Sequence, residues 1–475
     1  MINIMKSRAI FLQIASVIMA TITLTVGILF SSEFNYYFGI IAFSFFVLGI
    51  IIYMRQDIWR PAEIILIITP FQGVLTTIYG YVANVFTLIP IIVFLTQIPD
   101  KQFYKYLLGS RVQRLTALFI VTLTFSFLFS LRKFDVQILV DYAQKVTLFF
   151  LLAVFTASFQ KIHNISRLLW ILILSMSVFI VLSLADFYFG LHLIRHYGAW
   201  GDPGLLGELR NSAGIVNTTY IHNYRLYGIG GMISINRLSN WLILPIFAAL
   251  GCLLITRQKL TIIIAGAFLL ILSYGLIASS SRGSLLGFII ACVVILFVLR
   301  NRISNRIIML FMILGIAGIL FVKFGMAEIL TFRFTGSELT DLGRRYAMWQ
   351  FGIELFLRSP LFGAGANGFI NNAPIGLLNA DPHSAVIELL SQRGIFCMVS
   401  FLVLVIHVSY ILFRKIVNIP RNLAIWKNIF LGSWIGILIS NVFATYHYER
   451  LFWVVIGFAA FIEHQFTNYN LPKKN

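Results

Sequence analysis

Charged side chains are scarce in this sequence, and acidic ones are scarcest. Asp, Glu, Lys and Arg make up 11% of the 475 residues, with 17 acidic residues against 36 basic ones. Soluble domains are about 25% charged and about 45–50% apolar, whereas hydrophobic residues reach 59% here. So few charges cannot cover a water-facing surface of this size, which excludes a water-soluble globular protein. The same numbers exclude a disordered chain, because disordered chains are poor in apolar and aromatic residues.

Several chemical signatures are also missing. The sequence contains no D-x-D, which argues against a nucleotide-sugar enzyme with a bound divalent metal, and no Walker A motif, which argues against ATP as the energy source. Its three cysteines lie inside apolar segments, so no disulfide framework is indicated. His192 and His196 have an i, i+4 spacing that suits a metal, but no second pair of ligands accompanies them. We therefore expect neither a metal nor a cofactor.

Long apolar stretches recur along almost the whole chain. A spanning helix needs about 20 mainly apolar residues, and we identify fourteen stretches near that length, at 9–30, 36–54, 62–79, 81–97, 114–131, 141–159, 168–187, 237–256, 260–279, 284–299, 306–322, 395–413, 428–445 and 451–465. The run 62–97 holds either two short spans or one span and a broken segment. The sequence thus predicts an all-α polytopic membrane protein with about 12–14 transmembrane helices, forming a single membrane domain over residues 1–475.

The distribution of basic residues predicts the orientation. With the N-terminus inside, the cytoplasmic segments hold 21 of the Lys and Arg residues, whereas the short outer loops hold four. Cytoplasmic loops of membrane proteins carry such an excess. The net charge of +19 is explained by these loops, so we do not expect nucleic acid to be a partner. Both termini are predicted to be cytoplasmic, with two large outer loops at 188–237 and 323–394.

The second large loop contains a predicted amphipathic helix. Apolar residues recur at spacings of four and three between Asp341 and Arg358, and Arg344 and Arg345 lie in the first turn. Such a helix typically lies in the membrane interface. Its arginines either contact lipid headgroups in general or bind one specific lipid phosphate.

The same loop contains two sequences that suggest chemistry. Gly363, Gly365 and Gly368 spell G-x-G-x-x-G, but a dinucleotide site needs a preceding strand, and a predicted helix ends just before this motif. We interpret the motif as a tight loop. His383 is either a hydrogen-bonding loop residue or a general base, since a neutral imidazole accepts a proton near pH 7.

Arg282 lies in the short outer connection between two spans. An arginine at this depth either snorkels to the interface or binds an anion, and its planar guanidinium matches phosphate oxygens with two parallel hydrogen bonds. The sequence leaves both interpretations open.

Taken in order, these motifs resemble those of the bacterial O-antigen ligase and O-antigen polymerase superfamily. The resemblance extends from about residue 220 to 400. It rests on Arg225-x-x-Gly228 with Asn236, Ser281-Arg282-Gly283, Arg345 with Trp349, the Ser359-Pro360-Leu361-Phe362-Gly363-x-Gly365 turn, and His383-Ser384 followed by Gly394. Cys397 departs from the ligase-type histidine motif, where Gly, Thr or Tyr is usual.

The resemblance implies a metal-independent membrane glycosyltransferase of the bacterial inner membrane. Its donor would be a glycan on undecaprenyl diphosphate and its acceptor the hydroxyl of lipid A–core, as in O-antigen ligases. By analogy, His383 would be the general base, and Arg225, Arg282 and Arg345 would hold the diphosphate. An O-antigen polymerase that joins lipid-linked repeat units is the alternative. A lipid-linked oligosaccharide flippase is less consistent with the sequence, because paired broken helices and internal repeats are not evident.

Overall fold

In a computed structural model the described residues are 49–71, 85–130, 136–189, 226, 235–299, 339–366, 368–374, 382–416, 419–445 and 447–467. They form the following helices: α3 (Arg60–Ile68), η1 (Thr69–Phe71), α5 (Val85–Gln97), α6 (Asp100–Leu108), α7 (Arg111–Phe129), α8 (Val136–Ser158), α9 (Ile162–Phe189), α12 (Ile235–Ile255), α13 (Lys259–Ser279), α14 (Arg282–Leu299), α17 (Leu339–Arg358), α18 (Gly368–Asn372), α19 (Ala385–Glu388), the π-helix η6 (Leu389–Arg393), α20 (Gly394–Phe413), α21 (Arg421–Val442) and α22 (Arg450–Thr467).

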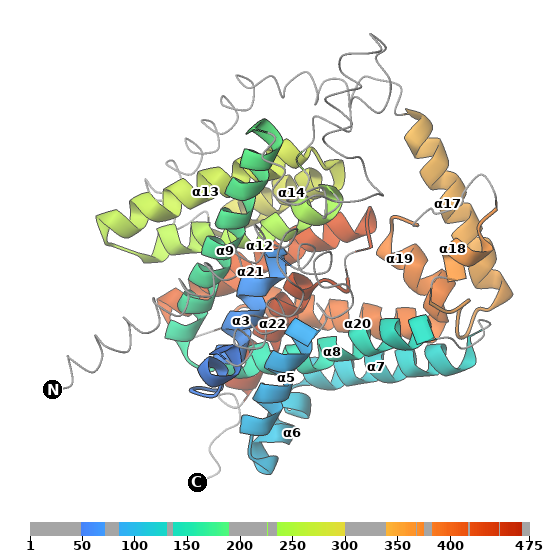
Figure 1. Cartoon of the computed structure of the whole chain (residues 1–475), viewed down its shortest axis with the longest axis horizontal. Helices are drawn as coiled ribbons and strands as arrows, with labels where there is room; N and C mark the ends of the chain where they lie inside the picture. The colour runs from blue at the N-terminus through green and yellow to red at the C-terminus, as the bar shows by residue number, and fades with distance from the viewer. Residues whose placement is uncertain are drawn as a thin grey trace, which may run out of the picture.

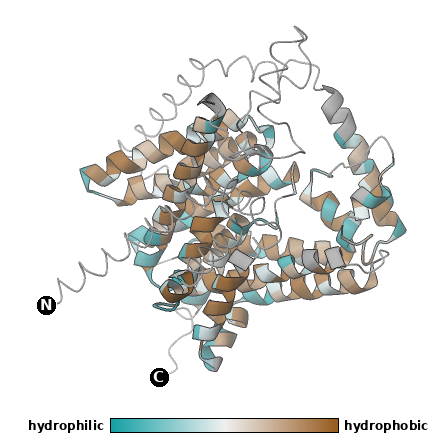
Figure 2. Cartoon of the chain, viewed as in Figure 1, coloured by the Kyte–Doolittle hydropathy of each residue, from teal (hydrophilic) through white to brown (hydrophobic). Residues whose placement is uncertain are grey.

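The predicted class of an all-α polytopic membrane protein is confirmed. Six helices among the described residues are long and apolar enough to cross a membrane: α7, α9, α12, α13, α21, and the run from α19 through α20. Figure 2 shows that the bundle helices are mostly hydrophobic, with polar residues collected near α6 and around α17 to α19. The predicted spans 9–30 and 306–322 lie outside the described residues.

The helices pack in two adjoining groups. In one group, α9, α12, α13, α14 and α21 pack on one another; in the other, α7 packs on α20 and α8 on α22. Contacts of α21 with α20 and α22 join the groups, and one core of buried apolar side chains extends through both. Figure 1 shows α17, α18 and α19 together on the right-hand side, above the ends of α7, α8 and α20 in this view.

Glycines let α14 approach α21 closely. Gly283 and Gly287 on α14, and Gly432 and Gly436 on α21, each recur at a spacing of four. A Cβ at Gly287 would overlap the carbonyl oxygen of Gly436, and one at Gly432 would lie 2.7 Å from Ile295 Cγ1. Small residues at this spacing allow close backbone approach between membrane helices. This pair of helices positions Arg282, the first residue of α14.

Gly287→Ala is expected to destabilise the protein by about 1–3 kcal/mol, because a methyl group there forces α14 away from α21. Thermal unfolding in detergent measures the change. Gly49→Ala is the matched control, since nothing lies within 4 Å of a Cβ at that helical glycine. Equal unfolding temperatures for the two variants would contradict the close packing of α14 on α21.

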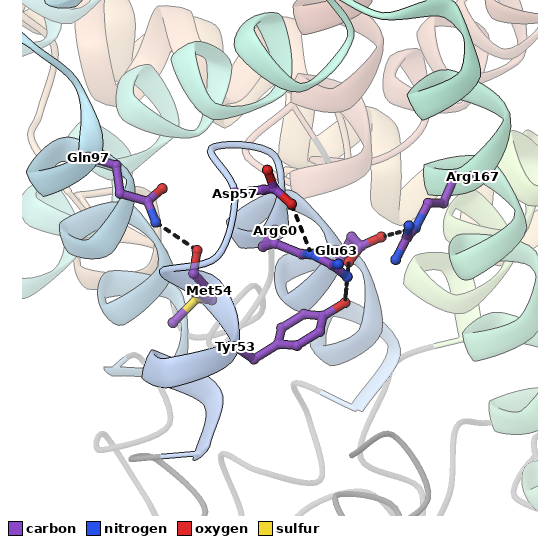
Figure 3. A network of polar contacts seen from close by, with 7 residues as sticks. All are labelled: Tyr53, Met54, Asp57, Arg60, Glu63, Gln97 and Arg167. Atoms are coloured by element: carbon purple, nitrogen blue, oxygen red, sulfur yellow. Dashed lines mark hydrogen bonds and ion pairs between the residues drawn. The ribbon is translucent and has the colours of Figure 1, made fainter. Parts of the chain in front are cut away.

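A buried polar network lies at the opposite end of the bundle (Figure 3). The Glu63 carboxylate is fully buried and accepts hydrogen bonds from Arg60 Nη1 at 3.2 Å, from Arg167 Nε at 2.6 Å and from the Tyr53 hydroxyl. The indole ring of Trp59 has both guanidinium groups within 4.3 Å of its centroid. Two basic residues assigned from the sequence to cytoplasmic loops thus join α3 to α9 through one carboxylate.

Two local features differ from the sequence-based expectation. The segment between the predicted spans 81–97 and 114–131 contains the short helix α6. In α17, the side that faces protein consists of Met348, Phe351 and Leu355. The apolar stripe predicted between Asp341 and Arg358 includes Tyr346 and Ile353, which are 62% and 49% exposed. Because both sides of α17 carry apolar residues, periodicity alone did not identify the one that packs against protein.

Candidate functional site

The starts of α12 and α14 are joined by a direct hydrogen bond. Ser281 Oγ donates to Asn236 Oδ1 at 2.8 Å, and the preceding Ser280 ends α13 in the left-handed conformation. Leu226 is fully buried and donates its backbone N–H to Ala278 O at 3.0 Å. Arg225 itself lies outside the described residues. Its neighbour Leu226 is bonded to Ala278, which precedes Arg282 by four residues. Arg282 is partly buried at the first position of α14.

A chain of buried hydroxyl groups holds three helices together next to the Asn236–Ser281 bond. Ser239 Oγ donates to Ser284 Oγ at 2.9 Å, and Ser284 Oγ lies 2.9 Å from Ser440 Oγ. These serines belong to α12, α14 and α21, so the end of α21 is fixed beside Arg282. Since α21 also contacts α19, the same helix end connects Arg282 with the segment that follows His383.

His383 is held beside α17 by its preceding residue. Trp349 Nε1 donates to Pro382 O at 3.0 Å, which attaches the His383 segment to α17. His383 is partly buried and has a φ of 48°, a left-handed conformation that is uncommon for residues other than glycine. Strained backbone of this kind is concentrated at functional sites. Arg345 is also partly buried and lies on α17, one turn before Trp349.

The glycine-rich turn forms a clasp with the π-helix η6. Ala364 N–H donates to Ser391 O at 2.9 Å, Gly365 N–H to Gln392 O at 3.0 Å, and Ile395 N–H to Pro360 O at 2.8 Å. The π-helix makes carbonyl groups available to the turn, and such helices are frequent at functional sites. Gly363 and Gly394 have φ of 75° and 77°, and a Cβ at either would overlap the opposite backbone. The G-x-G-x-x-G motif is therefore a loop that follows helix α17.

Residues 267–402 match the family described as O-antigen ligase. We call this matched segment the O-antigen ligase domain. The resemblance to the O-antigen ligase and polymerase superfamily predicted from the motifs is thereby confirmed. The matched residues include Arg282, Arg345 and His383, as well as both halves of the clasp. The comparison with curated proteins found no match.

Residues outside the O-antigen ligase domain contribute a buried charged cluster to the same end of the bundle. His447 is fully buried, with Nδ1 4.0 Å from Glu388 Oε2, and the Lys145 ammonium lies 4.4 Å from the ring centroid of Tyr448. Arg393, at the end of η6, is 2% exposed. Lys145, His447 and Tyr448 come from α8 and from the loop between α21 and α22. Sequence motifs did not identify this cluster, because these residues lie far apart in the chain.

The predicted site residues share one end of the bundle but come from separate elements. Arg282 lies at the start of α14, Arg345 on α17 and His383 before α19, whereas Arg225 falls outside the described residues. Helix α21, which lies outside the matched segment, links the start of α14 to the His383 segment, because its end is bonded to α14 and it packs on α19. No group of three or more potential metal ligands occurs within the described parts of the chain.

The neutral state of His447 predicts a pH dependence of stability. Burial, together with the nearby cations Lys145 and Arg393, holds the pKa of His447 well below its usual range. The unfolded chain binds a proton at a pKa of about 6.5 that the folded protein does not bind. The free energy of unfolding should therefore fall as pH falls below about 6.5, by up to about 1.4 kcal/mol per pH unit from this group.

Thermal unfolding of His447→Phe between about pH 7.5 and 5 tests this prediction, because phenylalanine keeps a ring beside Phe401 but cannot be protonated. The variant should lose stability less steeply on acidification than the unmodified protein. His163→Phe, at an exposed position of the opposite end, is the matched control and should keep the original slope. An unchanged slope in His447→Phe would refute the assignment.

Proposed function

We propose that this chain transfers a glycan from undecaprenyl diphosphate to an acceptor hydroxyl at the periplasmic face of the inner membrane. Its O-antigen ligase domain indicates activity of the ligase and polymerase family. The observation that supports the proposal most directly is that the domain contains Arg282 at the start of α14, Arg345 on α17 and His383 just before α19. These elements contact one another directly or through α21. Lipid A–core is the acceptor that we propose, which makes the chain an O-antigen ligase.

In the proposed reaction, His383 accepts the proton of the acceptor hydroxyl. The oxygen then bonds to the anomeric carbon of the donor glycan, while the bond from that carbon to the diphosphate oxygen breaks. The electron pair leaves with the diphosphate, whose developing charge is stabilised by Arg225, Arg282 and Arg345. Cations fixed before the reaction stabilise such charge effectively in a site of low dielectric. No metal is needed for any of these steps.

Cys397 favours a second candidate, an O-antigen polymerase. This residue stands where the ligase-type histidine motif usually has Gly, Thr or Tyr, and it is fully buried in α20. A polymerase would use the same donor and the same arginines, but its acceptor would be a second lipid-linked repeat unit. The two candidates therefore differ in the acceptor alone.

Transfer by the purified protein distinguishes the candidates. The protein is supplied with a lipid-linked glycan donor and either lipid A–core or a second lipid-linked repeat unit. A ligase converts lipid A–core to the glycan-bearing form, whereas a polymerase lengthens the glycan on undecaprenyl diphosphate. Absence of both products, together with movement of the donor across vesicles, would contradict the proposal and favour a flippase.

The proposed orientation predicts which introduced cysteines react with a membrane-impermeant thiol reagent in intact spheroplasts. Asn371→Cys, in α18, should react because the proposal places this end at the periplasm, and Lys161→Cys, between α8 and α9, should not react before lysis. Both positions are exposed, whereas native Cys252 and Cys397 are buried and Cys292 is partly buried. Reaction at position 161 in intact spheroplasts would contradict the proposed topology.

A further inference from the structure

Glu449 holds the side chain of Arg237 at the start of α12. Arg237 Nε lies 2.8 Å from Glu449 Oε1, and Trp241 Nε1 donates to Glu449 Oε2 at 3.0 Å. Trp241 is 2% exposed and the Glu449 side chain 14% exposed, so the carboxylate is anchored in the protein. The Arg237 side chain, by contrast, is 48% exposed. A well-anchored carboxylate thus orients an arginine that remains accessible from outside.

Arg237 and Arg282 occupy equivalent places on either side of one hydrogen bond. Asn236 and Ser281 are bonded at 2.8 Å, and each is followed directly by an arginine. The Asn236–Ser281 bond therefore fixes the backbones that carry both guanidinium groups. Glu449 belongs to the loop between α21 and α22, which lies outside the segment matched by the O-antigen ligase family.

The geometry of the guanidinium group suggests what Arg237 does. This group is planar and presents its donors in a rigid fork that matches phosphate oxygens. Contact of Glu449 with Nε restrains the orientation of this plane. An exposed arginine oriented in this way, on backbone that is bonded next to a second arginine, is suited to a ligand with more than one negative charge, such as a diphosphate.

We propose that Arg237 is a further donor-binding residue, which Glu449 and Trp241 position so that it binds the donor diphosphate together with Arg282. This inference rests on the proposed function. The alternative is that the Arg237–Glu449 ion pair serves only to hold α12 to the α21–α22 loop. A structural pair would contribute to stability but would not affect affinity for the donor.

Binding of undecaprenyl diphosphate to the full-length protein in nanodiscs is the first test. Arg237→Gln should weaken this binding by about 10- to 100-fold, as expected for loss of hydrogen bonds to a charged group. The matched control is Arg167→Gln, which removes an arginine from an ion pair with Glu63 at the opposite end of the bundle. That variant should lose thermal stability and keep its affinity. Unchanged affinity in Arg237→Gln would overturn the inference.

A charge exchange separates binding from structural support. Arg237→Glu combined with Glu449→Arg keeps an ion pair between the same positions and should recover stability relative to Arg237→Glu alone. If Arg237 binds the diphosphate, affinity should stay low in the exchanged protein. Recovery of both stability and affinity would show that the pair is structural only.

Two further measurements identify the ligand and keep the proposals distinguishable. Undecaprenyl monophosphate and phosphatidylglycerol should bind more weakly than the diphosphate to the unmodified protein, with a smaller loss in Arg237→Gln. Equal losses for all three lipids would indicate a general headgroup contact and overturn the inference. If the unmodified protein neither binds undecaprenyl diphosphate nor transfers glycan, the proposed function fails. If the unmodified protein does both and Arg237→Gln binds the diphosphate with the same affinity, only the proposed role of Arg237 fails.

Discussion

His383→Ala is expected to reduce the rate of glycan transfer by about 10²- to 10⁴-fold, the contribution typical of a general base. His383 is partly buried and lies between Pro382 and α19, outside the packed bundle, so the variant should insert and accumulate normally. Affinity for the lipid-linked donor should survive, because the arginines provide it. The measurement compares donor binding and product formation by the purified variant, each determined separately.

Two further variants distinguish a base from a structural residue. His383→Asn should be as inactive as His383→Ala, although asparagine tolerates the left-handed backbone at this position and keeps hydrogen-bonding capacity. Trp349→Phe removes the hydrogen bond to Pro382 O and should lower the rate less than loss of the histidine. Substantial transfer by His383→Asn would show that the residue supports the loop rather than accepting a proton.

Arg282→Lys is expected to weaken donor binding by about 10- to 100-fold while the protein remains folded. Lysine keeps the positive charge but loses the planar fork that binds two phosphate oxygens at once, and hydrogen bonds to charged groups contribute about 1.5–3 kcal/mol each. Binding of undecaprenyl diphosphate and thermal stability are measured on the same preparation.

Arg358→Lys, at the exposed end of α17, is the matched control and should retain full affinity. If Arg282→Ala binds the donor as well as the unmodified protein does, Arg282 merely extends to the interface. Full affinity in the lysine variant, with weakened binding in the alanine variant, would indicate that charge alone suffices.

The helices of the bundle were predictable because their apolar runs approach the length of a membrane span. The predicted spans 114–131, 260–279 and 395–413 correspond to α7, α13 and α20 within a few residues. The short helix α6 was missed because it has nine residues and a polar composition, which resembles a loop in a search for spans. The π-helix η6 was missed because it forms through backbone contacts with the turn at 359–366, which leave no period in the sequence.

The candidate site was predictable only where it forms local motifs. Arg282 and His383 lie in short polar segments between apolar runs, where they stand out. Lys145 is a charged residue within the predicted span 141–159. Its contact with Tyr448, however, joins residues about 300 positions apart. Likewise, nothing in the sequence around Glu449 indicates that its partner is Arg237. Such pairs depend on which helices become neighbours, and helix order in the bundle is not encoded in any one segment.

The hydroxyl chain from Ser239 through Ser284 to Ser440 has a consequence for building chimeric transferases. Of these three serines only Ser284 belongs to the O-antigen ligase domain, and Glu388, which also belongs to it, faces His447 outside the domain. A graft of residues 267–402 into a related scaffold would therefore separate these side chains from their partners and bury polar groups without compensation. A transplantable unit has to include the first turns of α12 and the chain from the end of α21 to the start of α22.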